Sequence, residues 1–357
     1  MLNKLKLRDY QEDIIKDILS NDYKEGIIVV GTGGGKTILG IELIARLGLT
    51  AVIITHTTVI SSQWKEEIEK YLDIKPCVID AGHKEIGQIT IVTVQSLAAD
   101  EELCKELASK TSILLVDECH LFVSDKRIEI LGQFAPKYLF GLTGSPFRDA
   151  SDGKSPVIGF LFGNKVCEFY PEQLKPTVEI VHCREELEMG EYHEIIDSMV
   201  DNDNRTTLIF GLGLGNAMEG KRILILTKRT RHAEIIYNKF SDEWKKKAVY
   251  LINSEDKNRN ELLKELKSGK KDFSIIIGTC SLLSTGTDVP SLDTVILSCD
   301  LKSEVLCLQS VGRIMRLFSG KKHATIIDIV DHHPILFRQF KSRLSFYRSK
   351  NWIISGI

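Results

Sequence analysis

One stretch near the start of the chain combines glycines with a lysine and a threonine. Residues 30–37 read Val-Gly-Thr-Gly-Gly-Gly-Lys-Thr and stand between an apolar run and a helical pattern. Backbone N–H groups of such a loop can wrap phosphate oxygens, Lys36 can reach the β- and γ-oxygens, and the Thr37 hydroxyl can ligate Mg²⁺. The pattern predicts a triphosphate-binding loop, although Val30 stands where the usual motif has its first glycine. The predicted ligand-binding residues of the loop are Gly33, Gly34, Gly35, Lys36 and Thr37.

Two adjacent carboxylates end a second apolar run. Residues 113–120 read Ile-Leu-Leu-Val-Asp-Glu-Cys-His. Asp117 at the strand tip can hold Mg²⁺ through water, and Glu118 can polarise the attacking water. An Asp-Glu pair after an apolar strand is often only a solvated strand end. Together with Lys36 and Thr37, however, the pair favours nucleotide hydrolysis.

A third group carries arginines on one predicted helix. Residues 309–316 read Gln-Ser-Val-Gly-Arg-Ile-Met-Arg, which places Gln309, Arg313 and Arg316 at i, i+4 and i+7 on one helix face. The ordinary interpretation of such a face is a set of surface salt bridges. Across a cleft from a phosphate loop, the two arginines are better interpreted as arginine fingers for a γ-phosphate.

The elements that must position these groups follow a regular alternation of short β-branched runs and helical patterns. Predicted strands of the first half cover about residues 26–31, 51–55, 76–80, 89–93, 113–117 and 138–142, with helices over 61–72 and 100–109. A second series of strands begins near Thr177 and includes about 222–227, 248–252, 274–278, 293–299 and 323–330. The alternation predicts an α/β fold in which parallel sheets are covered by helices on both faces.

The chain is long enough for two domains. It has 357 residues, and 43% of them are hydrophobic, which suffices for two cores. Pro171 and Pro176 break regular structure within the joining segment of residues 170–185. We therefore expect domains at residues 1–175 and 176–357.

Composition also indicates a compartment. The sequence contains no apolar run long enough to span a bilayer, and its N-terminus lacks the apolar region of a signal peptide. Eight cysteines are scattered without a C-x-x-C pair, which favours free buried thiols over a zinc or iron–sulfur site. We expect a cytoplasmic protein without a membrane partner, acting within a cell, its nucleoid or a phage-infected cell.

Charge is distributed unevenly along the chain. The formal net charge of −2 argues against a generally basic nucleic-acid binder, but the second half is the more basic. After Asp331 there is no further acidic residue, while basic residues alternate with aromatic ones. The basic residues of this segment are Arg338, Lys341, Arg343, Arg348 and Lys350. Two interpretations stay open and are compatible: a basic face that contacts phosphates, and an amphipathic helix whose aromatic residues close the second core.

Taken together, these segments resemble superfamily 2 helicases and translocases, which have two RecA-like domains. The resemblance extends from Leu7 to about Asp331, and the motifs occur in the family's order. It implies two mainly parallel sheets with helices on both faces, an ATP site in the cleft between the domains, and ATP and Mg²⁺ as cofactors. This superfamily tolerates a residue other than glycine at the position of Val30.

The resemblance implies the residues of the ATP site. Residues 7–11 look like an adenine-recognising Q-type motif that includes Arg8, with Gln11 as the base contact, and residues 117–120 form a DExH-type motif II. Residues 142–148 resemble motif III. The implied catalytic residues are Lys36, Asp117, Glu118, Gln309, Arg313 and Arg316, and motif V adds Gly286 and Asp288 to the nucleotide contacts.

Other motifs imply contacts to a nucleic-acid backbone. Residues 55–64 and 93–96 are similar to motifs Ia and Ib, residues 225–228 resemble motif IV, and residues 278–279 with 284–290 resemble motif V. The implied contact residues are Thr55, His56, Thr93, Gln95, Ser96, Lys228 and Thr279.

Within the superfamily, the motifs look closer to DNA-acting members, the XPB-like and phage UvsW-like branch-migration helicases. Those relatives usually carry an N-terminal accessory domain, whereas here the Q-type motif starts at Leu7. A strand-separating wedge is therefore in doubt, and partner proteins could supply one.

The expected function is an ATP-dependent DNA helicase or translocase in recombination, repair or replication. Its expected partner is branched, forked or single-stranded DNA, with RNA less favoured. Two alternatives stay open: an RNA helicase of the same architecture, and an ATP-gated DNA-binding subunit of a larger complex without unwinding activity.

Overall fold

A computed structural model describes residues 6–31, 33–79, 85–144, 155–172, 174–252, 259–280, 289–299, 311–312, 314–315, 317–318 and 320–356. It divides into two compact units, Met1–Pro171 and Glu172–Ile357. The division lies four residues before the expected one. Leu174 already belongs to the second unit, because its N–H donates to the carbonyl of Met315 at 2.8 Å.

The described part of the first domain contains a seven-stranded sheet in the order β3-β4-β2-β5-β6-β1-β7, with parallel neighbours throughout. The strands are β1 (Glu25–Val30), β2 (Ala51–Thr55), β3 (Cys77–Ile79), β4 (Ile89–Thr93), β5 (Ile113–Asp117), β6 (Tyr138–Thr143) and β7 (Lys165–Phe169). The helices are α1 (Asp9–Ser20), α2 (Lys36–Leu47), α3 (Thr58–Leu72), α4 (Val94–Ala99), α5 (Glu101–Lys110), the 3₁₀ turn η1 (Cys119–Leu121), α6 (Asp125–Gly132) and α7 (Ser155–Phe162).

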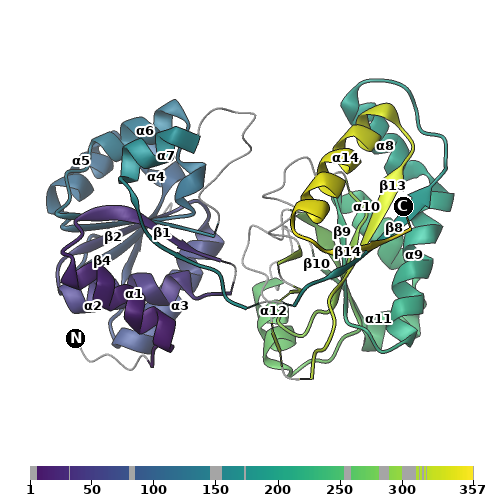
Figure 1. The fold of residues 1–357 in the computed structure, drawn as a ribbon, viewed down its shortest axis with the longest axis horizontal. Helices are drawn as coiled ribbons and strands as arrows, with labels where there is room; N and C mark the ends of the chain where they lie inside the picture. Colours follow the sequence, from purple (N-terminus) through teal and green to yellow (C-terminus); the bar gives the residue numbers. More distant parts are fainter. Residues whose placement is uncertain are drawn as a thin grey trace. The chain divides into compact units, whose positions relative to one another are not determined.

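Helices cover both faces of this sheet. Every residue of β2, β4 and β5 is buried, as the continuous apolar runs of a doubly covered parallel sheet require. Helices α1 to α3 lie on one face and α4 to α7 on the other (Figure 1).

The described part of the second domain repeats this architecture in the order β10-β11-β9-β12-β13-β8-β14, again with parallel neighbours. The strands are β8 (Thr177–Cys183), β9 (Ile223–Thr227), β10 (Val249–Ile252), β11 (Ile275–Thr279), β12 (Thr294–Leu297), β13 (Thr325–Asp331) and β14 (Ile353–Ser355). The helices are α8 (Tyr192–Asp201), α9 (Asp203–Met218), α10 (Thr230–Lys239), α11 (Asp242–Lys247), α12 (Arg259–Ser268) and α14 (Pro334–Ser349).

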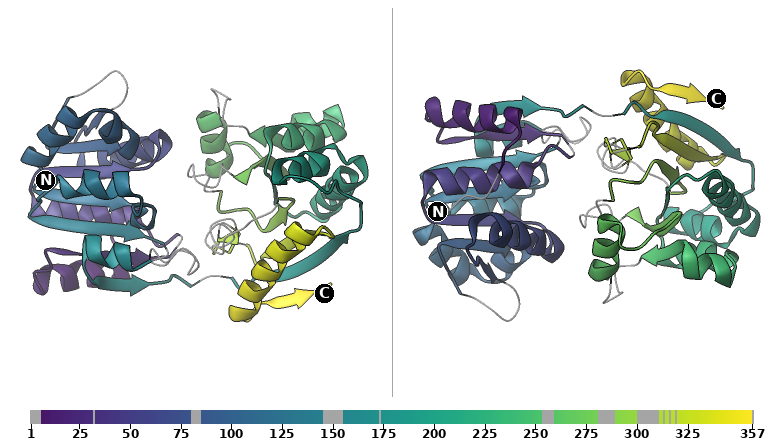
Figure 2. Two further views of the ribbon diagram at one scale, coloured as in Figure 1. Left: turned by 90° about the horizontal axis from the view of Figure 1, so that it is seen from above. Right: turned by 90° about the horizontal axis from the view of Figure 1, so that it is seen from below.

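Two separate clusters fill the faces of the second sheet. Ile209 of α9 and Ile236 of α10 pack on one face, while Leu266 of α12 and Phe340 of α14 pack on the other. Figure 2 shows helices on both sides of the sheet in each domain. Among the residues that the structure describes, no helix is both long and apolar enough to cross a membrane.

The α/β architecture predicted from sequence is confirmed, and each predicted strand has a counterpart within a few residues. The predicted joining segment, residues 170–185, is too long, because β8 occupies Thr177–Cys183 within it. Two edge strands, β7 and β14, were not predicted. Strand β7 is half-exposed and carries two charged residues, and β14 has three residues, so neither has the continuous apolar run that reveals the inner strands.

Of the two interpretations of the basic segment after Asp331, the phosphate-contacting face does not hold for Arg343. Its side chain is 5% exposed and forms two hydrogen bonds to Asp328, from Nε to Oδ2 at 2.9 Å and from Nη2 to Oδ1 at 2.8 Å. The hydroxyl of Tyr347 donates to Asp328 as well, at 2.9 Å. Helix α14 thus closes the second core with its aromatic residues, while Arg348 and Lys350 are exposed.

Candidate active site

The carboxyl ends of the inner strands bring the predicted site residues of the first domain to one edge of its sheet. In the parallel pairing, Thr55 of β2 lies opposite Thr93 of β4, and Asp117 of β5 lies opposite Leu142 of β6. The glycine loop follows β1 at the same edge. Open parallel sheets bind ligands at this edge, because the loops that leave the strands converge there.

The glycine loop has a backbone that other residues would not adopt easily. Gly33 and Gly35 have φ values of +83° and +77°, in the left-handed region that favours glycine. A Cβ on Gly34 would lie 2.4 Å from Cγ1 of Val30. Gly35 caps α2, whose first-turn N–H groups have no carbonyl partner within the helix. The loop therefore fits the cradle that phosphate oxygens require.

Helix α1 fixes this loop from outside. The hydroxyl of Tyr10 donates to the carbonyl of Gly34 at 2.7 Å, and Nε2 of Gln11 donates to the same carbonyl at 3.2 Å. The other amide atom of Gln11, Oε1, accepts the N–H of Arg8 at 3.0 Å. Tyr10 in turn stacks on Phe169, with ring centroids 3.8 Å apart. The structure places Gln11 against the phosphate loop, and its contact with a base stays a prediction.

Glu118 lies between a lysine and a histidine. Nζ of Lys36 is 3.2 Å from Oε1 of Glu118, and Nδ1 of His120 is 3.3 Å from Oε2. His120 also shares a hydrogen bond of 2.9 Å with the hydroxyl of Thr143 at the end of β6. Burial raises the pKa of Glu118, but Lys36 first and His120 second outweigh it, so the net pKa is lowered. Glu118 is therefore ionised at neutral pH and can accept a proton.

The neighbouring Asp117 is held by two donors. Nε1 of Trp64 donates to its Oδ2 at 2.9 Å, and the N–H of Glu118 donates to its Oδ1 at 2.9 Å. Burial and, second, the charge of Glu118 raise the pKa of Asp117 to about 6. Positive charge near this carboxylate would therefore be stabilising, as for a metal ligand.

The predicted nucleic-acid residues of the first domain divide into buried and accessible ones. Thr55 and Thr93 are buried, and their hydroxyls serve the protein: Thr55 bonds to Ser61 at 2.7 Å, and Thr93 caps α4 by accepting the N–H of Ser96 at 3.1 Å. Direct contact of these two threonines with a nucleic acid stays a prediction, and in the structure their hydroxyls bond within the protein. Gln95 is exposed, and its Nε2 donates to the carbonyl of His56 at 3.0 Å. His56, Gln95 and Ser96 thus remain accessible at this edge.

Two predicted contact residues lie at the carboxyl edge of the second sheet. Thr279 ends β11 opposite Thr227 of β9 and is 7% exposed, whereas Lys228 follows β9 and is exposed. Nζ of Lys228 donates a hydrogen bond to the hydroxyl of Tyr192. The same nitrogen lies 4.5 Å from the centroid of the Tyr192 ring. Several predicted residues lie outside the described ones: Gly286, Asp288, Gln309, Arg313 and Arg316, with residues 145–148 of the motif III-like segment.

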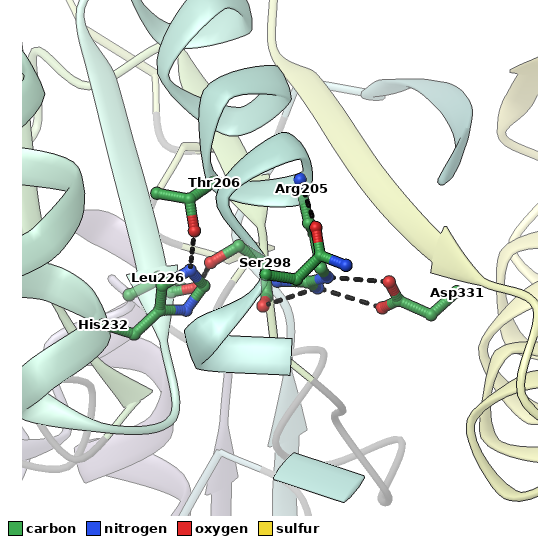
Figure 3. A network of polar contacts seen from close by, with 7 residues as sticks. Arg205, Thr206, Leu226, His232, Ser298 and Asp331 are labelled. Carbon is green, nitrogen blue, oxygen red and sulfur yellow. Dashed lines mark hydrogen bonds and ion pairs between the residues drawn. The ribbon is translucent and has the colours of Figure 1, made fainter. Parts of the chain in front are cut away.

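Sequence reasoning missed a buried polar network at the same edge of the second sheet. Arg205, 1% exposed near the start of α9, donates to Asp331 through Nε at 2.7 Å and Nη2 at 2.9 Å, and to the carbonyl of Ser298 at 3.1 Å (Figure 3). The Ser298 hydroxyl donates to the carbonyl of Leu226 at 2.6 Å. The network ties the ends of β9, β12 and β13 to α9. The available signal was the aspartate that ends the apolar run of β13.

Acid will destabilise the second domain through His232, which bonds to Thr206 in Figure 3. Burial and, second, Arg205 lower the pKa of His232 to about 3. Between this value and about 6.5 the unfolded chain binds a proton that the folded chain excludes, so stability is lost as pH falls through this window. At about pH 4.5 the loss amounts to about 2 to 3 kcal/mol.

Urea unfolding at about pH 7 and about pH 4.5 checks this expectation. His232→Gln keeps a polar group near Thr206 without a titrating ring, so it loses less stability on acidification than the wild type. The exposed His193 on α8 gives the matched control His193→Gln, which behaves as the wild type. Equal acid sensitivity of His232→Gln and the wild type would contradict the assignment.

Three further residues of the first domain were not singled out from the sequence: Tyr10, Gly40 and Trp64. Tyr10 and Trp64 lie in the motif-like segments 7–11 and 55–64, which gave neither a role of its own, and each of the three contacts a predicted site residue or its neighbour through space. A glycine inside the helical pattern that follows the phosphate loop was a signal, because glycine weakens a helix unless something must approach closely.

Comparisons with known proteins agree with this architecture. Residues 4–148 match the family model described as "Type III restriction enzyme, res subunit", and residues 172–318 match "Helicase conserved C-terminal domain". The solved structure of the ATP-dependent Type ISP restriction-modification enzyme LlaBIII bound to DNA has a TM-score of 0.70 and 15% identity. The match covers 97% of this chain and 30% of that chain, and it shows the fold alone.

Two curated relatives match almost the whole chain. The DNA 3'-5' translocase XPB2 of Sulfurisphaera tokodaii is 26% identical, and the alignment covers 96% of this chain and 85% of that protein. The ATP-dependent DNA helicase uvsW of Enterobacteria phage T4 is 24% identical, covering 90% of this chain and 68% of that protein. With one family model on each domain, the chain belongs to the superfamily 2 helicases and translocases and is similar to their XPB-like and UvsW-like members.

Proposed function

We propose that this chain is an ATP-dependent DNA helicase or translocase in which ATP hydrolysis drives movement along DNA. The observation that carries the proposal is the arrangement of Lys36, Asp117 and Glu118 at the sheet edge next to the glycine loop. Membership of the family implies ATP use, typically with Mg²⁺. The two curated relatives above are named as a DNA translocase and a DNA helicase, which favours DNA as the track.

The residues present fit a triphosphate and a magnesium ion. The loop N–H groups and Lys36 would hold phosphate oxygens, and Thr37 and Asp117 would hold Mg²⁺, which neutralises phosphate charge when bound. Lys36 can exchange its present partner Glu118 for those oxygens. Glu118, which is ionised at neutral pH, would then be available to accept the proton of the attacking water.

The proposal joins hydrolysis to movement through the shared sheet edge. His56 follows β2, the neighbour of the strand that carries Asp117, and Gln95 and Ser96 follow β4, one strand further along the same edge. Lys228 would add backbone contacts from the second domain. Gln309, Arg313 and Arg316, with Gly286 and Asp288, would complete the ATP site when the domains close on the nucleotide. Contacts to the backbone carry no sequence information, so DNA binding should tolerate sequence and weaken with salt.

The finer proposal concerns the process and the compartment. The motif resemblance to the XPB-like and UvsW-like branch-migration helicases favours branch migration or the remodelling of forked DNA in recombination, repair or replication. Such a protein would act inside the cell, on DNA with or without accessory proteins.

ATPase stimulation by a panel of nucleic acids tests the proposal. We expect forked DNA or four-way junctions to raise turnover above the basal rate more than RNA of matched length does. ATP should also drive the displacement of streptavidin from biotinylated DNA, which reports movement, and Glu118→Gln should abolish both signals. Stronger stimulation by RNA would favour the RNA helicase. Stimulation by DNA without displacement or strand separation would favour the ATP-gated binding subunit.

A further inference from the structure

We infer that Trp64 is a positioning residue for the metal-holding carboxylate Asp117, and that Gly40 keeps open the space in which its indole lies. The inference rests on the proposed function, because it assigns a partner to the carboxylate that would hold Mg²⁺. Trp64 lies on α3, away from the phosphate loop in sequence, and its indole reaches the end of β5.

The first argument is the hydrogen-bond geometry. Each oxygen of Asp117 accepts one fixed donor at 2.9 Å, Oδ2 from the indole N–H of Trp64 and Oδ1 from the backbone N–H of Glu118. These two bonds set the plane of the carboxylate. An ionised carboxylate oxygen can accept more than one bond, so both oxygens keep a lone pair for a metal or its water. Outer partners of this kind orient metal ligands.

The second argument is burial. Trp64 is 1% exposed and Asp117 is 7% exposed. A charged carboxylate in such a place is costly unless donors compensate it. The indole can only donate, so it stabilises the charged form of Asp117 that a metal requires and offers no acceptor that would compete for the metal.

The third argument is the space that the indole occupies. A Cβ on Gly40 would lie 2.6 Å from Cη2 of Trp64, closer than real Cβ contacts, and 3.1 Å from Cδ1 of Leu115. Gly40 lies inside α2, where glycine costs about 1 kcal/mol relative to alanine. A glycine at this position is explained if the indole of Trp64 must pass close to the backbone of α2 at Gly40. Trp64 thereby links the helix that begins with Lys36 to the strand that ends with Asp117.

A purely structural role predicts different behaviour, since a buried tryptophan stabilises a core whatever its N–H contacts. Trp64→Phe removes the donor and keeps most of the aromatic packing. Trp352→Phe is the matched control, because Trp352 is also buried, at 8% exposure, among Phe346 and Tyr347 of the second domain.

The test measures Mn²⁺ binding by electron paramagnetic resonance in the presence of a non-hydrolysable ATP analogue, with Mn²⁺ standing in for Mg²⁺. We expect Trp64→Phe to weaken Mn²⁺ binding by about 10- to 100-fold, as loss of other outer partners of metal ligands does. Trp352→Phe should leave Mn²⁺ binding unchanged. Raising Mg²⁺ should restore most of the ATP turnover of Trp64→Phe, because Asp117 itself is intact.

Gly40→Ala supplies a second variant that keeps the indole but displaces it. Alanine favours a helix, so a loss of metal affinity would come from crowding by the new Cβ, whose closest contact is Trp64, ahead of Leu115 and Leu142. Gly211→Ala in α9 is its control, because a Cβ there meets nothing within 4 Å. We expect Gly40→Ala to weaken Mn²⁺ binding and Gly211→Ala to leave it unchanged.

Unchanged Mn²⁺ binding in folded Trp64→Phe would overturn the inference, as would unchanged binding in Gly40→Ala should Trp64→Phe not fold. Failure of the proposed function looks different: the wild type itself would then not bind Mn²⁺ with the nucleotide, or would not hydrolyse ATP.

Discussion

Lys36→Ala will lower ATP turnover by roughly 10²-fold or more, because the loss of a charge that stabilises the phosphates in the transition state costs several kcal/mol. In the structure this lysine is the first residue of α2 and lies 3.2 Å from Glu118, so its removal also takes away the cation that lowers the pKa of the proposed base. Steady-state hydrolysis at saturating Mg²⁺ measures the effect.

Glu118→Gln separates chemistry from binding at the same site. Glutamine keeps the size of the side chain but cannot take a proton from water, so hydrolysis should fall by roughly 10²-fold or more while ATP binding is retained. Lys16→Ala and Glu69→Gln are matched controls, since both side chains are exposed on helices away from the loop. Near-wild-type turnover of either site variant would show that the active site lies elsewhere.

The two predictions above concern residues that sequence motifs identify. At the same edge of the first sheet, however, the motifs did not identify every residue that contacts the site. Lys36, Asp117 and Glu118 were predictable because phosphate and metal chemistry demands particular side chains at particular strand ends. Trp64 was not, because its indole reaches Asp117 across 53 positions of sequence, and only the packing of α3 on the sheet brings the two together. A motif shows which residue types follow a strand in sequence, but it does not show which distant side chains pack against the end of that strand.

Burial is the second property that the sequence conceals. Thr55 and Thr93 follow apolar strand residues just as accessible contact residues do, yet their hydroxyls bond to Ser61 and Ser96 inside the protein. Short polar side chains at strand ends are ambiguous because capping the next helix and contacting a ligand use the same hydroxyl. Strand positions were predictable from apolar runs, while the roles of the polar residues at their ends required the structure.

Arg343→Met will lower the free energy of unfolding of the second domain by about 3 to 5 kcal/mol, because removal of one partner of a buried pair leaves the other charge uncompensated. Asp328 is completely buried and, among the residues that the structure describes, would keep the hydroxyl of Tyr347 as its side-chain donor. Methionine preserves the apolar part of the side chain, so lost packing contributes little. Urea unfolding reports on this domain when Trp64 and Trp244 are replaced by Phe in every variant, so that the fluorescence comes from Trp352, whose ring stacks on Tyr347.

Two comparisons distinguish the structural role of Arg343 from a surface role of the basic residues Arg348, on α14, and Lys350, which caps it. The exposed Arg348→Gln and Lys350→Gln should change stability by less than about 0.5 kcal/mol. If Arg348 and Lys350 contact DNA phosphates, each variant should reduce the slope of log K for DNA binding against log[salt] by up to about 0.9. Adding Asp328→Leu to Arg343→Met should recover much of the lost stability, because an apolar pair replaces a lone buried charge. Equal destabilisation by Arg343→Met and Arg348→Gln would instead mean that Asp328 finds water or another donor, and that the arginine contributes no more than its exposed neighbour does.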